Sequence, residues 1–300
     1  MLTSAVLRTP GPGSIYADVL SAASPRATTL VMVHGGAHSG ECFLRTPDGR
    51  RGWAFALADQ GFPVVVPDWP GIGRSGYVST DILDGAFVVS GLAALLEKIS
   101  GPIVLLVHSM SGCYGWRLAE LCRDRITAVV AIAPAPPGNI QPEARVIRED
   151  RDTIEVDTFG RRLVMAKSQW NVPSAEEVAQ KYVGDSAYFP RSHIEQYRNG
   201  LLGIPPRIRI ERRNVRGSQV RVEDPSRLDG LPVLLMLGDR DLDHPRDYDE
   251  RIAVWLSENG ARTEFCYLPE RGISGNGHMM MLETNSDVIV GIISDWLLRL

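Results

Sequence analysis

Apolar, β-branched stretches alternate along this chain with helix-like segments, and this alternation restricts the possible folds more than any other feature. We predict strands at residues 29–33, 62–67, 102–107, 127–133, 231–237 and 263–268. We predict helices at residues 53–60, 82–99, 110–122, 248–258 and 286–298. Strands that alternate with helices are typical of α/β proteins, in which helices flank a mostly parallel sheet. The 300 residues are enough for one such core with an insertion.

The regular pattern is interrupted between residues 134 and 230, where the sequence becomes polar, irregular and partly helical. A loop of that length without secondary structure is uncommon in a compact domain, so we predict a cap inserted between two strands. The expected division is a core of residues 1–136 and 228–300 and a cap of residues 137–227. The cap contains scattered aromatic residues, which we interpret first as its own small core and second as pocket lining: Trp170, Tyr182, Tyr188, Phe189 and Tyr197.

A predicted strand, a sharp turn that carries Ser109 and a predicted helix follow one another. Such a turn raises a serine hydroxyl above the carboxyl end of a sheet and points the following amides at the substrate. Ser109 is therefore the predicted nucleophile. The glycine pattern of such turns is imperfect here, because Val107 and Ser111 occupy the usual glycine positions and Gly112 comes one place later. Two alternatives stay open: Ser111 is the nucleophile, or Ser109 only caps the helix.

A short acidic loop with Asp239, Asp241 and Asp243 follows the predicted strand at residues 231–237. A carboxylate just past this strand can orient the Nδ1–H of a histidine and stabilise the imidazolium ion. We predict that Asp241 has this role, because it lies three residues after Gly238, the usual offset. Asp239 and Asp243 are its rivals, although we expect their carboxylates to point to solvent or to cap the turn.

Six histidines are present, and only His278 lies in a loop between the last predicted strand and the last predicted helix. Glycines just before it allow the loop to bring an imidazole over a serine, so His278 is the predicted base. Acyl transfer also needs two preorganised amide donors for the oxyanion. We predict that the Met110 amide is one donor and the Gly36 amide the other, with Ala37 as the second choice for the latter.

Composition and charge exclude several classes of function. The formal net charge is −4, with 32 Lys and Arg against 36 Asp and Glu, so no basic excess indicates nucleic acid. The basic stretch at residues 207–221 is interpreted as a solvated face. No apolar run approaches the roughly 20 residues that span a membrane, and no signal peptide is evident. The four cysteines lack zinc-site spacing, so we expect free, mostly buried thiols and a reducing, cytoplasmic compartment.

With these residues in order, the chain resembles esterases of the α/β-hydrolase fold, whose mostly parallel sheet is flanked by helices. Several segments are similar in particular to a small group of bacterial carboxylesterases. The specific ones are residues 46–53, TPDGRRGW, and residues 275–281, GNGHMMM. Residues 34–35, 71–75 and 108–112 match motifs that much of the superfamily shares. The likeness covers most of the core and fails across the cap.

The chain departs from that group in two places. Members can carry adjacent cysteines in the oxyanion loop, where Gly36 and Ala37 stand here. Members can also take the acid of the triad, a Glu, from just after the strand that follows the nucleophile helix. That place, residues 132–137, has no carboxylate in this chain, so the prediction returns to Asp241.

Together, the residues and the resemblance predict a serine hydrolase that cleaves a small carboxylic ester or lactone through an acyl-enzyme. We expect no metal, no organic cofactor and no nucleic-acid or membrane partner, and we allow for a homodimer. One rival is another chemistry on the same residues: amide, thioester or carbon–carbon hydrolysis, or cofactor-independent oxygenation. The other rival is a ligand-binding protein of this fold that has lost turnover.

Overall fold

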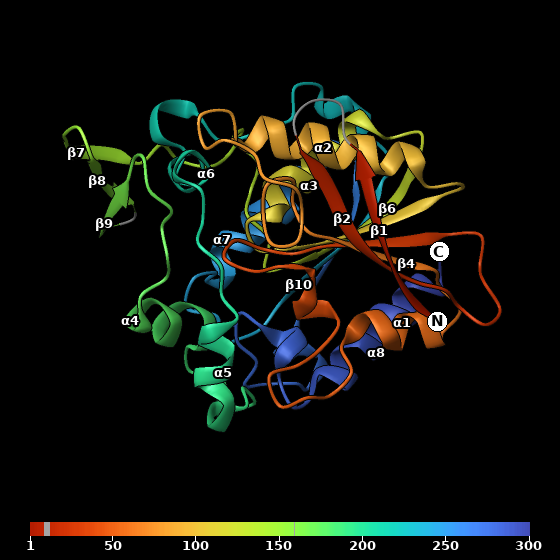
Figure 1. The fold of residues 1–300 in the computed structure, drawn as a ribbon. Coiled ribbons are helices and arrows are strands. Elements are labelled where there is room, and N and C mark those ends of the chain that lie inside the picture. Colours follow the sequence, from red (N-terminus) through yellow and green to blue (C-terminus); the bar gives the residue numbers. More distant parts are fainter. Residues whose placement is uncertain (9–12, 159) are drawn as a thin grey trace.

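The computed structural model describes residues 1–8, 13–158 and 160–300 and is built around one large sheet (Figure 1). The strands of this sheet are β1 (Leu2–Arg8), β2 (Ser14–Leu20), β3 (Thr29–Val33), β4 (Val64–Pro67), β5 (Ile103–His108), β6 (Ile126–Ile132), β10 (Pro232–Leu237) and β11 (Arg262–Tyr267). Their order across the sheet is β1-β2-β4-β3-β5-β6-β10-β11. β1, β2 and β4 pair antiparallel, whereas β4, β3, β5, β6, β10 and β11 run parallel to their neighbours.

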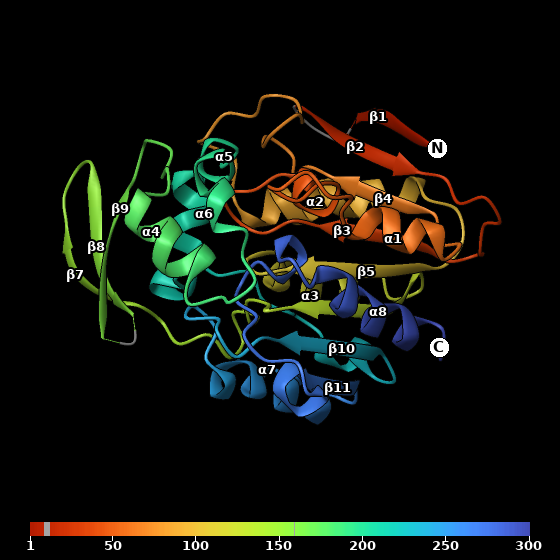
Figure 2. The same ribbon diagram turned by 90° about the horizontal axis from the view of Figure 1, so that it is seen from below.

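The central parallel strands are apolar throughout, and every residue of β3, β4 and β5 is buried. Burial on both sides requires a helical layer on each face. α1 (Trp53–Asp59) and α8 (Ser286–Leu297) lie together on one face, and α2 (Gly85–Lys98) and α3 (Ser111–Leu121) on the other (Figures 1 and 2). α7 (Arg246–Glu258) packs against the edge strand β11.

This architecture confirms the predicted α/β-hydrolase fold class. Each of the predicted strands and helices is present, with ends that differ by at most three residues. The sequence analysis missed β1 and β2, which extend the sheet by an antiparallel pair at one edge. All four cysteines are free, and only Cys122 is not buried, as expected. Among the described residues, no helix is long and apolar enough to cross a bilayer.

Between β6 and β10 the chain leaves the sheet and forms a layer at the end of the molecule opposite both termini (Figures 1 and 2). Its helices are α4 (Ala175–Glu177), α5 (Ile194–Asn199) and α6 (Pro206–Glu211). A small antiparallel sheet of β7 (Arg145–Glu149), β8 (Thr153–Thr158) and β9 (Arg161–Ala166) projects from this layer. We had interpreted this region as irregular and partly helical, so the small sheet is a correction. Its strands bury a few apolar residues of their own, such as Ile154 and Val156.

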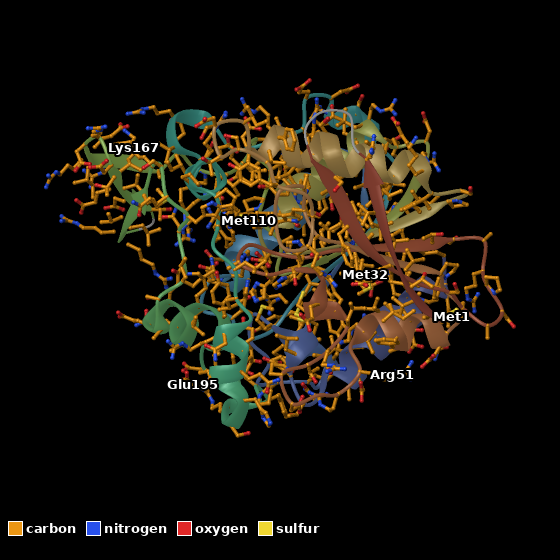
Figure 3. All side chains as sticks on the ribbon, viewed as in Figure 1. Met1, Met32, Arg51, Met110, Lys167 and Glu195 are labelled. Carbon is orange, nitrogen blue, oxygen red and sulfur yellow. The ribbon has the colours of Figure 1, made fainter. Side chains whose placement is uncertain are left out.

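The basic stretch at residues 207–221 is not a solvated face throughout, which corrects the expectation from sequence. Arg209 and Arg212 are each only 7% exposed. Each is held by a hydrogen-bond partner: Arg209 donates to Glu177 at 2.7 Å, and Arg212 donates to the buried Gln141 at 3.3 Å. In Figure 3, Met110 lies between this layer and the sheet, while Lys167 and Glu195 lie on the layer's outer side.

A contact between α6 and α2 predicts a pH-dependent stability. Glu211 accepts a hydrogen bond from the Gly85 N–H at 2.7 Å, and burial raises the pKa of its carboxyl from 4.5 to about 7. The native state therefore holds this proton more tightly than the unfolded chain, so stability falls as pH rises from about 4.5 to about 7. Glu211→Gln keeps an oxygen acceptor and removes the charge. Its melting temperature should exceed that of wild type above pH 7, and the difference should vanish near pH 4.5.

Differential scanning calorimetry at both pH values checks this prediction. Glu258→Gln is the matched control, because Glu258 is exposed at the end of α7. A melting-temperature gain for Glu211→Gln that is the same at both pH values would contradict the assigned protonation of Glu211.

Candidate active site

The turn between β5 and α3 holds Ser109 in a backbone conformation that few residues other than glycine adopt, with φ of 52°. Three backbone hydrogen bonds fix it. The Ser109 N–H donates to the Ile132 carbonyl at 3.0 Å, and the Ser109 carbonyl accepts from the N–H groups of Gly112 at 2.8 Å and Ala135 at 2.7 Å. At Gly112, a Cβ atom would lie 2.5 Å from the backbone of Ala135, so only glycine fits there. Strained residues that their surroundings hold in this way concentrate at functional sites.

Ser111, the alternative nucleophile, is already engaged in the core. Its Oγ donates to the His34 carbonyl at 2.5 Å and accepts from the Trp69 Nε1–H at 3.0 Å. Ser111 thereby links the first turn of α3 to the chain segments that follow β3 and β4. The geometry therefore favours Ser109 over Ser111 as the reactive hydroxyl.

The structure brings Ser109, Asp241 and His278 into one hydrogen-bonded chain. The Nε2 atom of His278 lies 2.9 Å from Ser109 Oγ, and its Nδ1 atom lies 2.7 Å from Asp241 Oδ2. When Nδ1–H donates to the carboxylate, Nε2 carries the lone pair that can accept the serine proton. All three residues are buried, and Ser109 is 7% exposed.

Asp241 is held in place through its second oxygen. Oδ1 accepts the N–H groups of Asp243 and His244, at 2.9 and 3.1 Å. These two bonds leave Oδ2 to His278 and fix the direction of the carboxylate. His244, the next histidine in the loop, has a different partner, because its Nδ1 atom lies 3.0 Å from Asp249.

The other two carboxylates of this loop neither point to solvent nor cap their own turn, so that expectation was wrong. Asp239 accepts the N–H of Gly275 at 2.6 Å and so links its loop to the one that carries His278. Asp243 forms an ion pair with Lys181 at 2.9 Å, and the surrounding positive charge holds the pKa of its carboxyl well below the usual range despite burial. The reason is that Asp239 faces the loop that carries His278 and Asp243 faces the inserted layer, so each carboxylate finds a partner across a contact between segments.

The loop that carries His278 is fixed by residues that the sequence analysis did not single out. Glu283 accepts the Gly277 N–H at 2.7 Å and the Ser186 hydroxyl at 2.5 Å, and burial raises the pKa of its carboxyl. His108 Nε2 lies 3.1 Å from the carbonyl of His278. A glutamate five residues after the predicted base was a signal in the sequence, but its partners could not be known without the fold.

The predicted amide donors, Gly36 and Met110, lie beside Ser109. A Cβ on Gly35 would come within 2.9 Å of Ser109 Cβ, and one on Gly36 within 2.7 Å of Met110 Cε, so this loop passes close to the serine. Within the described ranges, neither the Gly36 nor the Met110 N–H donates a hydrogen bond. The same holds for Ala37, so both choices for the second donor stay open.

The inserted layer is tied directly to this loop. The Leu202 N–H donates to the Ala37 carbonyl at 2.8 Å. His38 Nδ1 lies 2.8 Å from the Gly36 carbonyl, and His38 Nε2 lies 2.8 Å from the Tyr197 hydroxyl. Burial lowers the pKa of His38 to about 3, so its ring is neutral, donates from Nδ1 to the carbonyl and accepts from Tyr197.

The aromatic residues of the layer divide between its own packing and the site. The Tyr182 ring lies 6.3 Å from the His278 ring and 5.2 Å from the His38 ring. Tyr197 contacts His38 and also packs against Phe189 at 5.1 Å. Trp170 is exposed. Tyr182 and Tyr197 therefore reach the site, but nothing in the local sequence separates them from the other aromatics.

The Tyr197–His38 hydrogen bond yields a stability prediction. Tyr197→Phe leaves the buried His38 Nε2 without its donor, and an unsatisfied buried acceptor costs about 1–3 kcal/mol. Urea unfolding should show a free energy of unfolding that is lower by this amount, and therefore a lower midpoint. Tyr188→Phe is the control, because no hydrogen bond of the Tyr188 hydroxyl is found among the described residues. Equal midpoints for Tyr197→Phe and wild type would show that this bond adds nothing to stability.

The sheet order and the serine at the turn after β5 are features of an α/β hydrolase, and comparison with known families agrees. The profile of the alpha/beta hydrolase family matches residues 30–292, and the chain belongs to that family. Among curated proteins it is similar to "Probable secreted lipase phiG" of Fungal sp. (strain ATCC 74256), with 24% identity over 89% of this chain and 81% of that protein.

Two solved structures share the fold. A thermophilic esterase from Thermogutta terrifontis, with malate bound, has a TM-score of 0.63 and 17% identity over 99% of this chain and 98% of the other. Est1E from Butyrivibrio proteoclasticus, with ferulic acid bound, has a TM-score of 0.59 and 16% identity over 98% of each chain. Across the described residues of the present chain, no group of three or more His, Cys, Asp or Glu side chains could hold a metal ion.

Proposed function

We propose that the protein is a serine hydrolase that cleaves carboxylic esters, lactones included, through an acyl-enzyme. The observation that carries the proposal is the hydrogen-bonded chain from Ser109 Oγ through His278 to Asp241, with distances of 2.9 and 2.7 Å. Membership of the alpha/beta hydrolase family supports it, and so do the lipase and esterases among the similar proteins.

In the acylation step, Ser109 Oγ attacks the ester carbonyl while His278 Nε2 accepts the hydroxyl proton. Asp241 stabilises the imidazolium ion that forms, because its carboxylate faces the Nδ1–H. Collapse of the tetrahedral intermediate expels the alcohol, to which His278 returns the proton. For a lactone the alcohol remains attached to the acyl group. Water then attacks the acyl-enzyme with the same proton transfers.

We assign the stabilisation of the negative charge on the tetrahedral intermediate to the N–H groups of Gly36 and Met110. Both N–H groups lie beside Ser109 and lack acceptors among the described residues. Preorganised donors that become satisfied only in the transition state contribute strongly to catalysis, since removal of one such donor costs about 10²–10³ in kcat.

We also propose that residues 137–227 act as a cap that encloses the substrate and excludes water. The bond from Leu202 to Ala37 and the low exposure of Ser109 support this role. A site shielded from bulk water strengthens the electrostatic interactions on which the mechanism depends.

The proposal is tested by a panel of activated esters, lactones, amides and thioesters, assayed with and without oxygen, together with a fluorophosphonate probe. We expect ester turnover without oxygen and covalent labelling of wild type, with no labelling of Ser109→Ala. Labelling without ester turnover would shift the assignment to another chemistry on the same residues. Absence of both would leave a ligand-binding protein of this fold.

A further inference from the structure

Four basic side chains of the inserted layer gather beside the loop that carries Asp241: Lys181, Arg209, Arg212 and Arg213. We call them the basic cluster. Cations withdrawn from water are costly unless an opposite charge or several acceptors compensate them. Opposite charges or hydrogen-bond acceptors are therefore expected close to the basic cluster.

Two carboxylates face the basic cluster. Asp243 pairs with Lys181 at 2.9 Å, and Glu177 pairs with Arg209 at 2.7 Å. Within the described ranges no ion pair is found for the other two arginines. Burial and the neighbouring Arg209 charge lower the pKa of Arg213 to about 10, as expected for a cation without its own anion. The cluster thus has a surplus of positive charge.

Three hydrogen-bond donors in this region have no acceptor among the described residues: Arg209 Nη1, Arg213 Nε and the Tyr182 hydroxyl. Tyr182 is 2% exposed, and burial raises the pKa of its hydroxyl, so this group is a donor at neutral pH. More than nine-tenths of buried polar groups are paired in folded proteins, so three unpaired donors beside this excess of positive charge indicate an absent acceptor.

The basic cluster lies within reach of a substrate bound at Ser109. The Tyr182 ring lies 6.3 Å from the His278 ring, and Asp243, the partner of Lys181, donates its N–H to Asp241. The Arg212 charge also acts on the thiol of Cys113, which lies in the first turn of the helix after Ser109. The charge is therefore close to the reacting ester but separate from it.

We propose that Arg209, Arg213 and Tyr182 bind a free carboxylate of the substrate, so that the preferred substrates are monoesters of dicarboxylic acids. This inference rests on the proposed function of Ser109. A carboxylate offers about four lone-pair sites, which match the three unpaired donors and leave one for Lys181 or water. It also brings the negative charge that the basic cluster lacks.

The test compares 4-nitrophenyl esters that differ only in one terminal group. The neutral hexanoate and heptanoate are paired with the adipate and pimelate monoesters, in which a carboxylate replaces the terminal methyl. Each is assayed for kcat/KM with wild type, Arg213→Met, Arg209→Met and Tyr182→Phe. Arg216→Met is the matched control, because Arg216 is exposed and pairs with Glu149 in the outer sheet.

We expect wild type to prefer an anionic ester by about 10- to 100-fold, the range for hydrogen bonds to a charged group. Arg213→Met and Arg209→Met should bring that preference close to one, and the ratio of anionic to neutral ester within each variant separates this effect from a general loss of activity. Arg213→Lys should retain part of the preference, since it keeps the charge and loses the planar fork. Arg216→Met should retain all of it.

Equal kcat/KM of wild type for the neutral and anionic esters would overturn the carboxylate site and leave the proposed function intact. If a variant fails to fold, wild type alone still tests the site. Adipate and hexanoate are then compared as inhibitors of neutral-ester hydrolysis, and adipate should inhibit more strongly. Equal inhibition by the two acids would also overturn the site. If no ester is hydrolysed, the proposed function fails, and the carboxylate site is tested by binding. Adipate should then raise the melting temperature of wild type but not that of Arg213→Met, and no rise for wild type would overturn the site.

Discussion

Ser109→Ala should abolish ester hydrolysis and leave the fold intact. Removal of a nucleophile from a comparable triad costs on the order of 10⁶ in kcat, because the acyl-enzyme can no longer form. The fold should survive because, among the described residues, the Ser109 side chain hydrogen-bonds only with His278, while the strained turn is held by backbone bonds to Ile132 and Ala135. Steady-state kinetics and circular dichroism of the same preparation measure both effects.

The control for this experiment is Ser111→Ala. Ser111 bonds to the His34 carbonyl and to Trp69, so its loss should lower stability by about 1–3 kcal/mol while fluorophosphonate labelling persists. The opposite result, with labelling lost in Ser111→Ala and more than a tenth of the wild-type rate kept in Ser109→Ala, would transfer the nucleophile to Ser111.

Asp241→Asn should lower kcat on the order of 10⁴, as the same change does in a comparable triad. The reason lies in the two oxygens of Asp241. Oδ1 is fixed by two backbone N–H groups, so the asparagine oxygen should take that position and place its amide against His278 Nδ1. The imidazole must then accept at Nδ1 and carry its proton on Nε2, where it can no longer accept from Ser109.

Three further variants separate the acid from its neighbours. Asp239→Asn weakens the link to Gly275, and Asp243→Asn leaves Lys181 without its partner, so both should lower stability more than they lower kcat. Glu143→Gln should be silent, because Glu143 is exposed in the cap. If Asp241→Asn leaves kcat nearly unchanged while one of these three variants loses most of its activity, the residue changed in that variant is the acid.

The core could be predicted from sequence because its elements are fixed by local patterns. The strand at Ile103–His108 is a continuous apolar run buried on both faces, and the helix after it follows a turn marked by small residues. β1 escaped the analysis because its side chains are mostly exposed, so no burial pattern distinguishes it. The three strands of the small outer sheet are short and rich in charge, and their pairing depends on distant residues such as Val215.

The site could be predicted in part for the same reason. Ser109, Asp241 and His278 each follow a strand of a parallel sheet, and the carboxyl ends of such strands meet at one edge. The ion pair of Asp243 with Lys181, the anchor at Glu283 and the inward turn of Arg209 could not be predicted. Each depends on how the cap folds back over the core, and no local spacing encodes that.

The bonds from Leu202 to Ala37 and from Tyr197 to His38 also bear on how a ligand enters the site. In the cap role proposed for residues 137–227, a ligand reaches Ser109, which is 7% exposed, after the cap has moved. Loss of these two hydrogen bonds, at about 0.5–1.5 kcal/mol each, would by itself limit the open population to between roughly a sixth and roughly a 160th of the molecules. The ion pair of Lys181 with Asp243 lowers it further. By that proposal the association rate constant is scaled down by the same fraction, and the cap slows the capture of substrate while it keeps water away from the reaction.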